Sequence, residues 1–264
     1  MGVIVLRVKI GCCGFPMSRS RYYELFSVVE VQQTFYKLPS PDTLKRWRDE
    51  APKDFEFTVK AWQVVTHSPG SPTWRKAGIT IDSKDRDYYG LLKPTQQNFN
   101  AWKQFIQVIE PLNPRIIVIQ TPPSLKYNEI NFNNILKFFK YIHENYPQYL
   151  VGWEPRGNWK EHLDKIEVIV KEVNIIHIVD PFKLKPIISN NRLCYFRLHG
   201  IGPGEVNYRY KYTDEDFEKL VNVLKDIEKN GIEVCYIMFN NVYMRDDALR
   251  FKEYLTRLGL FEVT

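Results

Sequence analysis

Eight short apolar segments, separated mostly by helix-like stretches, constrain the fold of this chain more than any other feature of its sequence. They are Val3–Ile10, Val28–Val31, Phe55–Lys60, Arg115–Gln120, Tyr149–Glu154, Asn174–Asp180, Cys194–His199 and Glu233–Phe239. Strands that alternate with helices form parallel sheets, and eight such repeats indicate a closed barrel rather than an open doubly wound sheet. We therefore predict an α/β fold, a single (β/α)8 TIM-type barrel that forms one domain over residues 1–264.

One stretch departs from this alternation. Residues Ser68 to Tyr89, after the third strand, are rich in Pro, Gly, Ser and mixed charge. Such composition predicts a long loop excursion, and a loop of this length in a barrel can act as a lid.

Charge and cysteine content narrow the class of protein. The net charge of +6 suits a polyanionic partner, although ordinary soluble enzymes also carry such a charge. The four cysteines show no CxxC spacing, so we expect reduced thiols. The first apolar run is interrupted by Arg7 and Lys9, and the sequence shows no membrane span or cleavage site. These features predict a cytoplasmic protein that does not enter membranes.

The stretch Leu193 to Gly200 combines a buried-strand pattern with two polar side chains. Arg197 and His199 stand two residues apart, so they share one face of the strand. Arginine is rarely buried without a partner, which predicts an anionic group nearby. If that group is a ligand, Arg197→Met should cost the protein little stability.

Other strands end in the same way. Polar residues fall at or just past the carboxyl ends of seven strands: Glu30, Lys60, Gln120, Glu154 with Arg156, Asp180, Arg197 with His199, and Asn240 with Asn241. Barrel enzymes build their sites at these ends, because the strands hold side chains rigidly while the loops vary. We expect the set to surround a single mouth.

Several motifs resemble those of a known family. They are Glu30 to Pro39 followed by Trp47, Phe55 to Lys60, Thr66-His67, Gln120 to Pro123, Glu154-Pro155-Arg156, Val179-Asp180, Tyr195 to Gly200 and Phe239 to Asn241. In this order they resemble the YecE-like family, domain of unknown function 72 (DUF72). The resemblance implies a TIM-type barrel and no settled activity. It also draws attention to His67, while Gln32, Cys12 and Cys13 depart from the family pattern and receive no role.

The residue types suggest acid–base chemistry on a phosphate. Candidate catalytic residues are Glu154, Asp180, His199 and Glu30, with Glu154 or Asp180 as general base and His199 as acid. Candidate substrate-binding residues are Lys60, His67, Gln120, Arg156, Arg197, Tyr36, Asn240 and Asn241. The carboxylates and imidazoles would also suit a divalent metal ion such as Mg, Mn or Zn. The competing interpretation is a plain ion-pair network, in which Arg156 and Arg197 neutralise Glu154 and Asp180.

These features favour an enzyme that acts on a phosphate-containing substrate, with nucleic acid as the favoured class and endonuclease-like phosphodiester hydrolysis as the reaction. A sugar or sugar-phosphate isomerase or hydrolase is the first alternative, because aromatic walls and paired carboxylates also serve sugars. A non-catalytic nucleic-acid-binding protein is the second. The sequence does not predict the oligomeric state.

Overall fold

The computed structural model describes residues 5–264, which divide into two compact units. Unit 1 comprises the chain up to Glu30 together with Pro52–Glu56 and Ile176–Thr264. Unit 2 comprises Val31–Ala51 and Phe57–Ile175. Each unit is therefore assembled from stretches that are distant in the sequence.

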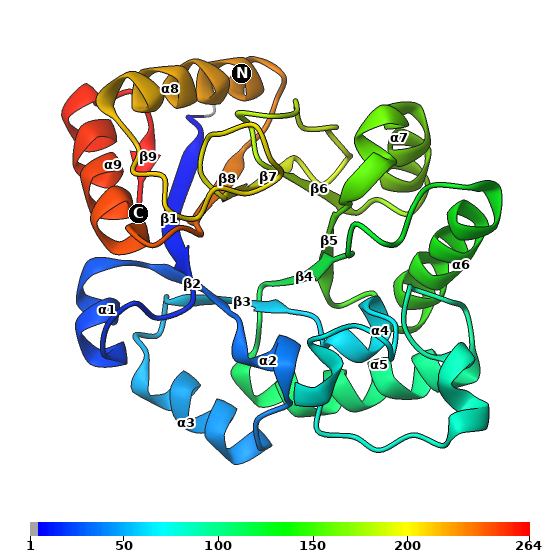
Figure 1. Cartoon of the computed structure of the whole chain (residues 1–264). Helices are drawn as coiled ribbons and strands as arrows, with labels where there is room; N and C mark the ends of the chain where they lie inside the picture. Colours follow the sequence, from blue (N-terminus) through cyan, green and yellow to red (C-terminus); the bar gives the residue numbers. More distant parts are fainter. Residues whose placement is uncertain (1–4) are drawn as a thin grey trace. The chain divides into compact units, whose positions relative to one another are not determined.

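The strands follow the order of a (β/α)8 barrel. They are β1 (Arg7–Cys13), β2 (Val28–Val31), β3 (Glu56–Lys60), β4 (Ile116–Gln120), β5 (Leu150–Glu154), β6 (Ile176–Val179), β7 (Leu193–Leu198), β8 (Val234–Phe239) and β9 (Glu262–Val263). Hydrogen-bonded neighbours run β2-β3-β4-β5-β6-β7-β8-β1-β9, and β1 also pairs with β2, which is the strand order of a closed ring of eight. Figure 1 labels these strands along the chain. The predicted (β/α)8 fold class is confirmed.

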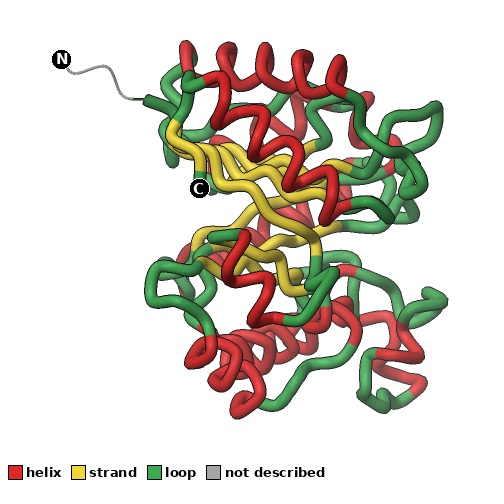
Figure 2. Tube along the Cα trace, turned by 90° about the vertical axis from the view of Figure 1, so that its left-hand side faces the viewer, coloured by secondary structure: helices red, strands yellow, loops and turns green. Residues whose placement is uncertain are grey.

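Helices separate most of the strands. They are α1 (Arg19–Leu25), α2 (Gln33–Tyr36), α3 (Pro41–Glu50), α4 (Gln63–Thr66), α5 (Gln96–Ile109), α6 (Glu129–Asn145), α7 (Leu163–Glu172), α8 (Asp214–Lys229) and α9 (Met244–Leu258). Short 3-10 helices are η1 (Trp74–Lys76), η2 (Ser83–Tyr88), η3 (Glu110–Leu112) and η4 (Gly157–Glu161). In the tube view the helices of each unit lie outside its strands (Figure 2).

The parallel β1, β7 and β8 form the centre of unit 1. Cys12 of β1 is level with Phe239 of β8, and Leu198 of β7 is level with the same residue. Helix α9 packs against β1 and β8, and α8 packs against α9. Because the carboxyl ends of these strands are in register, residues that follow them are brought to one edge of the sheet.

Strands β3, β4 and β5 form the corresponding core of unit 2. Strand β4 is buried along its whole length, as its unbroken Ile and Val run predicted. In the β4–β5 register Gln120 is level with Glu154, and in the β3–β4 register Lys60 is level with Val118. Helices α3 and α4 pack against α5 in this unit.

Local capping chemistry starts the longer helices where the sequence indicates. The side chains of Ser40, Thr95 and Asn128 each accept a hydrogen bond from the backbone N–H three residues later. Thr213 and Asp216 form a reciprocal capping box at the start of α8. Between β5 and β6 the chain forms the short 3-10 helix η4 and then α7, instead of one continuous helix.

The first strand differs from its prediction. Val3 lies outside the described residues, and β1 continues through Gly11 to Cys13 instead of turning after Ile10. A Cβ atom at Gly11 would lie 2.4 Å from the carbonyl oxygen of Val28. This glycine therefore permits the close approach of β1 to β2 and does not mark a turn. Strand β9 was also not predicted.

The loop excursion predicted after the third strand is present. Residues 68–89 contain η1 and η2. The next three residues, Gly90, Leu91 and Leu92, have left-handed φ values of 75°, 56° and 50°. Among residues 5–264, no helix combines the length and the apolarity needed to cross a membrane.

Candidate functional site

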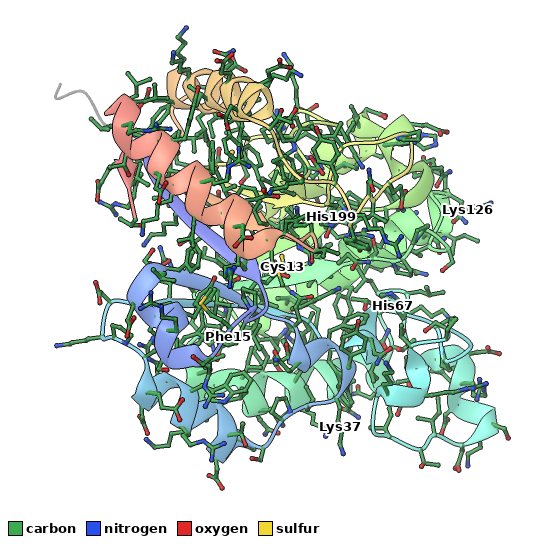
Figure 3. All side chains as sticks on the ribbon, turned by 60° about the vertical axis from the view of Figure 1, so that its left-hand side comes forward. Cys13, Phe15, Lys37, His67, Lys126 and His199 are labelled. Carbon is green, nitrogen blue, oxygen red and sulfur yellow. The ribbon has the colours of Figure 1, made fainter. Side chains whose placement is uncertain are left out.

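The twelve predicted site residues divide equally between the two units. Unit 1 holds Glu30, Asp180, Arg197, His199, Asn240 and Asn241, and unit 2 holds Tyr36, Lys60, His67, Gln120, Glu154 and Arg156. Figure 3 labels His199 in the first unit and His67 in the second. The expectation that all twelve surround one mouth stays a prediction.

In unit 1 the anion expected beside Arg197 is a side chain of the protein itself. The Arg197 guanidinium donates to both carboxylate oxygens of Glu30, with Nε–Oε2 at 3.1 Å and Nη2–Oε1 at 2.9 Å. Tyr195, two residues earlier on the same strand face, donates its hydroxyl to Glu30 Oε2 at 2.8 Å. The side chains of Arg197 and Glu30 are 1% and 0% exposed. Arg197 therefore pairs with Glu30, a carboxylate that the competing ion-pair interpretation did not include.

This buried group extends to β1. Cys13 is level with Glu30 in the β1–β2 register, and its thiol lies next to Arg197. Burial raises the pKa of Cys13 well above its ordinary value, and the Glu30 charge adds to the rise. A thiol with a raised pKa is a poor nucleophile, so Cys13 packs here rather than reacts. The Glu30–Arg197 ion pair therefore links β2 to β7 in the interior of unit 1.

Asp180 and His199 lie together, as expected for residues that follow neighbouring strands. Asp180 Oδ2 accepts the backbone N–H of His199, and its Oδ1 accepts that of Phe182, both at 3.1 Å. The next backbone N–H, that of Gly200, donates to the Tyr212 hydroxyl at 2.8 Å. Burial and the nearby Asp180 charge raise the pKa of Tyr212. Asp180 therefore holds the backbone at the end of β7 in addition to any role in acid–base chemistry.

Asn240 and Asn241 follow β8. Asn240 donates its backbone N–H to Leu198, while the Asn241 amide donates to the carbonyl of Tyr210 and to Asp247, each at 2.7 Å. Burial raises the pKa of Asp247, and the Asn241 hydrogen bond opposes this rise. The side-chain amide of Asn241 thus connects the loop after β8 to the loop that contains Tyr210 and to Asp247 of α9.

In unit 2 the carboxyl ends of β4 and β5 place Gln120 beside Glu154. Arg156, two residues further on, donates from Nε and Nη2 to Glu154 Oε1, at 3.2 and 2.9 Å. The ion-pair interpretation holds for this pair. Its side chains are 14% and 10% exposed, so solvent reaches this pair, unlike Arg197 and Glu30.

Lys60 and His67 complete the set in unit 2. Lys60 Nζ lies 4.1 Å above the ring of Phe35, and His67 packs edge-on against the same ring at 5.0 Å. Burial lowers the pKa of His67 to about 3, and the charges of Lys60 and Arg156 add to this effect. His67 is therefore a neutral imidazole at physiological pH, with Nδ1 2.8 Å from the Thr66 hydroxyl.

Tyr36 is the most solvent-exposed of the twelve predicted site residues. Its ring is 42% exposed and touches Phe35, while its carbonyl accepts the amide of Gln63 at 3.0 Å. Phe35 is not among the twelve predicted site residues, yet its ring contacts Tyr36, Lys60 and His67. Tyr195 was also missed, although the period of two from Arg197 could have indicated it.

The described residues contain no group of three or more His, Cys, Asp or Glu side chains arranged to hold a metal ion. The four cysteines are free and buried. No ligand set for the expected divalent ion is therefore assigned.

Comparison with known proteins decides the family. A family model described as "Protein of unknown function DUF72" matches residues 18–261. The chain belongs to the DUF72 family. UPF0759 protein YunF of Bacillus subtilis (strain 168) is 24% identical over 263 residues, which cover 90% of this chain and 86% of YunF. The family resemblance carried by the motifs is thus confirmed.

Solved DUF72 structures share the fold of this DUF72 chain. A DUF72 protein from Enterococcus faecalis V583 superposes with a TM-score of 0.71 at 17% identity, covering 97% of this chain and 99% of the other. A DUF72 protein from Thermotoga maritima MSB8 gives a TM-score of 0.66 at 23% identity, covering 95% and 99%. At these identities the likeness establishes the fold alone.

Proposed function

We propose that this DUF72 protein binds a phosphate-bearing ligand through Lys60, His67, Gln120 and Arg156 in unit 2. The observation that carries the proposal is that Lys60 and His67 pack against the same Phe35 ring, at 4.1 and 5.0 Å, while the charge of Arg156 also acts on His67. An ammonium, a guanidinium and an imidazole gathered in this way offer several N–H donors. Such donors match the oxygens of a phosphate, with Arg as a planar fork and Lys as a point charge.

The solvent exposure of the two arginine–glutamate pairs also favours unit 2 as the place where a ligand binds. Arg156 and Glu154 are partly exposed, whereas Arg197 and Glu30 are closed off from solvent. A ligand can therefore approach the first pair. Because a bound phosphate would offset the charges of Lys60 and Arg156, its binding should raise the pKa of His67 and take up a proton in mildly acidic solution.

Our proposal extends to nucleic acid as the favoured substrate class and to phosphodiester hydrolysis as the reaction. The net charge of +6 supports a polyanionic substrate. Glu154 is the proposed general base of unit 2, and Asp180 with His199 are the proposed acid–base residues of unit 1. Four free cysteines are consistent with a reducing compartment, and we infer a cytoplasmic location.

The direct test is calorimetric binding of inorganic phosphate and of a nucleotide monophosphate. Lys60→Met and Arg156→Gln should each weaken binding about tenfold or more, the loss expected for one charge-assisted contact. Lys103→Met and Arg115→Gln are matched controls. Lys103 is exposed on α5, and Arg115 lies at the amino end of β4, so both variants should bind like the parent.

Equal phosphate affinity in Lys60→Met and Lys103→Met would contradict the proposal. Binding of a neutral sugar without phosphate binding would favour the sugar-enzyme alternative. Salt-dependent binding of nucleic acid that is unaffected by Glu154→Gln, without turnover, would favour the non-catalytic binding protein.

A further inference from the structure

Three large side chains are exposed beside the carboxyl ends of β7 and β8 in unit 1. Tyr208, Val242 and Tyr243 expose 43%, 68% and 40% of their surface. Many other aromatic residues of the chain are buried, among them Tyr195, Tyr212 and Tyr236. We refer to Tyr208, Val242 and Tyr243 as the tyrosine platform.

Two loops are joined beneath the tyrosine platform. The backbone N–H of Val242 donates to the carbonyl of Tyr208 at 2.7 Å, and the Asn241 amide donates to the carbonyl of Tyr210 at 2.7 Å. The first loop is also held at its start, where the N–H of Asn207 donates to His199 at 2.8 Å. These bonds fix the backbone that carries the rings, so little conformational entropy remains to be lost when a ligand binds.

The tyrosine platform is also connected to the predicted acid–base residues of unit 1. The ring of Tyr208 lies 6.1 Å from that of His199, centroid to centroid. His199 is itself held by Asp180 through its backbone N–H. A ligand that stacks on Tyr208 would therefore lie next to the end of β7.

Cationic residues accompany both tyrosines. Lys211 Nζ lies 5.6 Å from the centroid of the Tyr243 ring, and Arg209, which follows Tyr208 in the chain, is exposed. Arg245, the second residue of α9, is exposed and pairs with Asp246. Aromatic faces interleaved with Lys and Arg are the combination that binds single-stranded nucleic acid, since bases stack on the rings while cations contact phosphates.

We propose that the tyrosine platform, with Arg209 and Lys211, binds single-stranded nucleic acid. The ligand class rests on the proposed function, but the surface and its residues are independent of the phosphate-binding set of unit 2. Duplex bases are stacked on one another and do not offer their faces to Tyr208 and Tyr243. The platform therefore favours a single strand over a duplex of the same sequence.

Fluorescence anisotropy with a labelled oligothymidine tests the proposal on the full chain at about 50 mM salt, where phosphate contacts are strong. Tyr208→Ala and Tyr243→Ala should each weaken binding about tenfold, as expected for the loss of one stacked base. Tyr208→Phe and Tyr243→Phe keep the rings and should bind like the parent. Tyr243 makes no side-chain capping bond to α9, so its replacement should leave the melting temperature unchanged.

Tyr88→Ala provides a matched control. Tyr88 is 49% exposed in η2 of unit 2, so loss of its ring should leave oligothymidine binding unchanged. The double variant Arg209→Met/Lys211→Met should reduce the slope of log affinity against log salt by roughly 1.4, because each single-strand phosphate contact contributes about 0.7.

The outcomes separate this proposal from the proposed function. Tyrosine-dependent oligothymidine binding without any phosphate binding by Lys60 and Arg156 would overturn only the proposed function. Absence of oligothymidine binding, or binding that is equal in Tyr208→Ala and Tyr88→Ala, would overturn the platform. Self-association of the parent that Val242→Ser abolishes, without oligothymidine binding, would assign the surface to a second copy of the chain instead.

Discussion

At the scale of single residues, the burial of Glu30 and Arg197 changes the effect on stability that we expect when either residue is replaced. Both are buried, and the guanidinium lies against the carboxylate in a two-point contact. Replacing Arg197 by Met leaves the Glu30 carboxylate in a dry interior without its guanidinium. We therefore now expect Arg197→Met to lower the free energy of unfolding by about 3–5 kcal/mol, opposite to the small cost expected from sequence. Urea unfolding measures this change.

The double variant Glu30→Gln/Arg197→Met should recover most of that loss, because it removes both charges. Arg192→Met is the control: Arg192 pairs with Glu233 at the surface near the start of β7, and exposed pairs contribute at most about 1 kcal/mol. A loss in Arg197→Met no larger than that in Arg192→Met would show that the buried pair is not structural.

At the scale of elements, helix α5 secures the end of the 68–89 excursion through one side chain. Asn98 accepts the N–H of Gly90 at 2.8 Å and donates to the carbonyls of Gly90 and Lys93, at 3.0 and 2.9 Å. This clamp bridges the turn formed by the left-handed residues Gly90, Leu91 and Leu92. Asn98→Ala should cost about 2 kcal/mol and speed protease cleavage within residues 68–92. Limited proteolysis with mass spectrometry identifies the cleaved bonds.

The control for the clamp lies on the same helix. Asn100 is exposed, and its side chain accepts a hydrogen bond from the Gln96 amide on the same helix, so Asn100→Ala should be cleaved like the parent. Cleavage of Asn98→Ala at the parental rate would mean that other contacts hold the excursion.

At the scale of the whole molecule, His67 couples folding to pH. Its pKa is lowered to about 3 in the folded protein, from 6.5 in the unfolded chain. Below pH 6.5 the unfolded chain therefore binds a proton that the folded protein does not, so stability falls as the pH is lowered towards 3. His67 alone should account for roughly 2 kcal/mol between about pH 6.5 and 4.5. Thermal melting across this range measures the loss.

His67→Asn should flatten this dependence, because an amide does not titrate and can still bond to the Thr66 hydroxyl. His143→Asn, on the exposed side of α6, should leave the dependence unchanged. If His67→Asn melts with the parental pH dependence, the pKa of His67 does not change on folding. The proposed donor set of unit 2 would then be wrong.

The fold could be predicted from sequence because its signals are local. The Ile and Val run of β4 indicates a buried strand, and the Thr213–Asp216 box and the Ser40–Pro41 pair mark helix starts with their own hydrogen bonds. Short-range geometry determines these features, so neighbouring residues suffice to recognise them. The short strand β9 and the extension of β1 through Gly11 were not predicted, because each depends on a partner strand elsewhere in the chain.

The sequence by itself determined which residues stand at the carboxyl ends of the strands, and hence the candidates for a site. Only the tertiary structure decided what each of them contacts. Arg197 meets Glu30 across a separation of 167 residues, while Arg156 bonds to Glu154 two residues away and stays accessible to solvent. The period of two assigns a side chain to a face of its strand, but strand order and register choose its partner and its burial. That is why an arginine within or after a strand is closed off from solvent in one unit and partly exposed in the other.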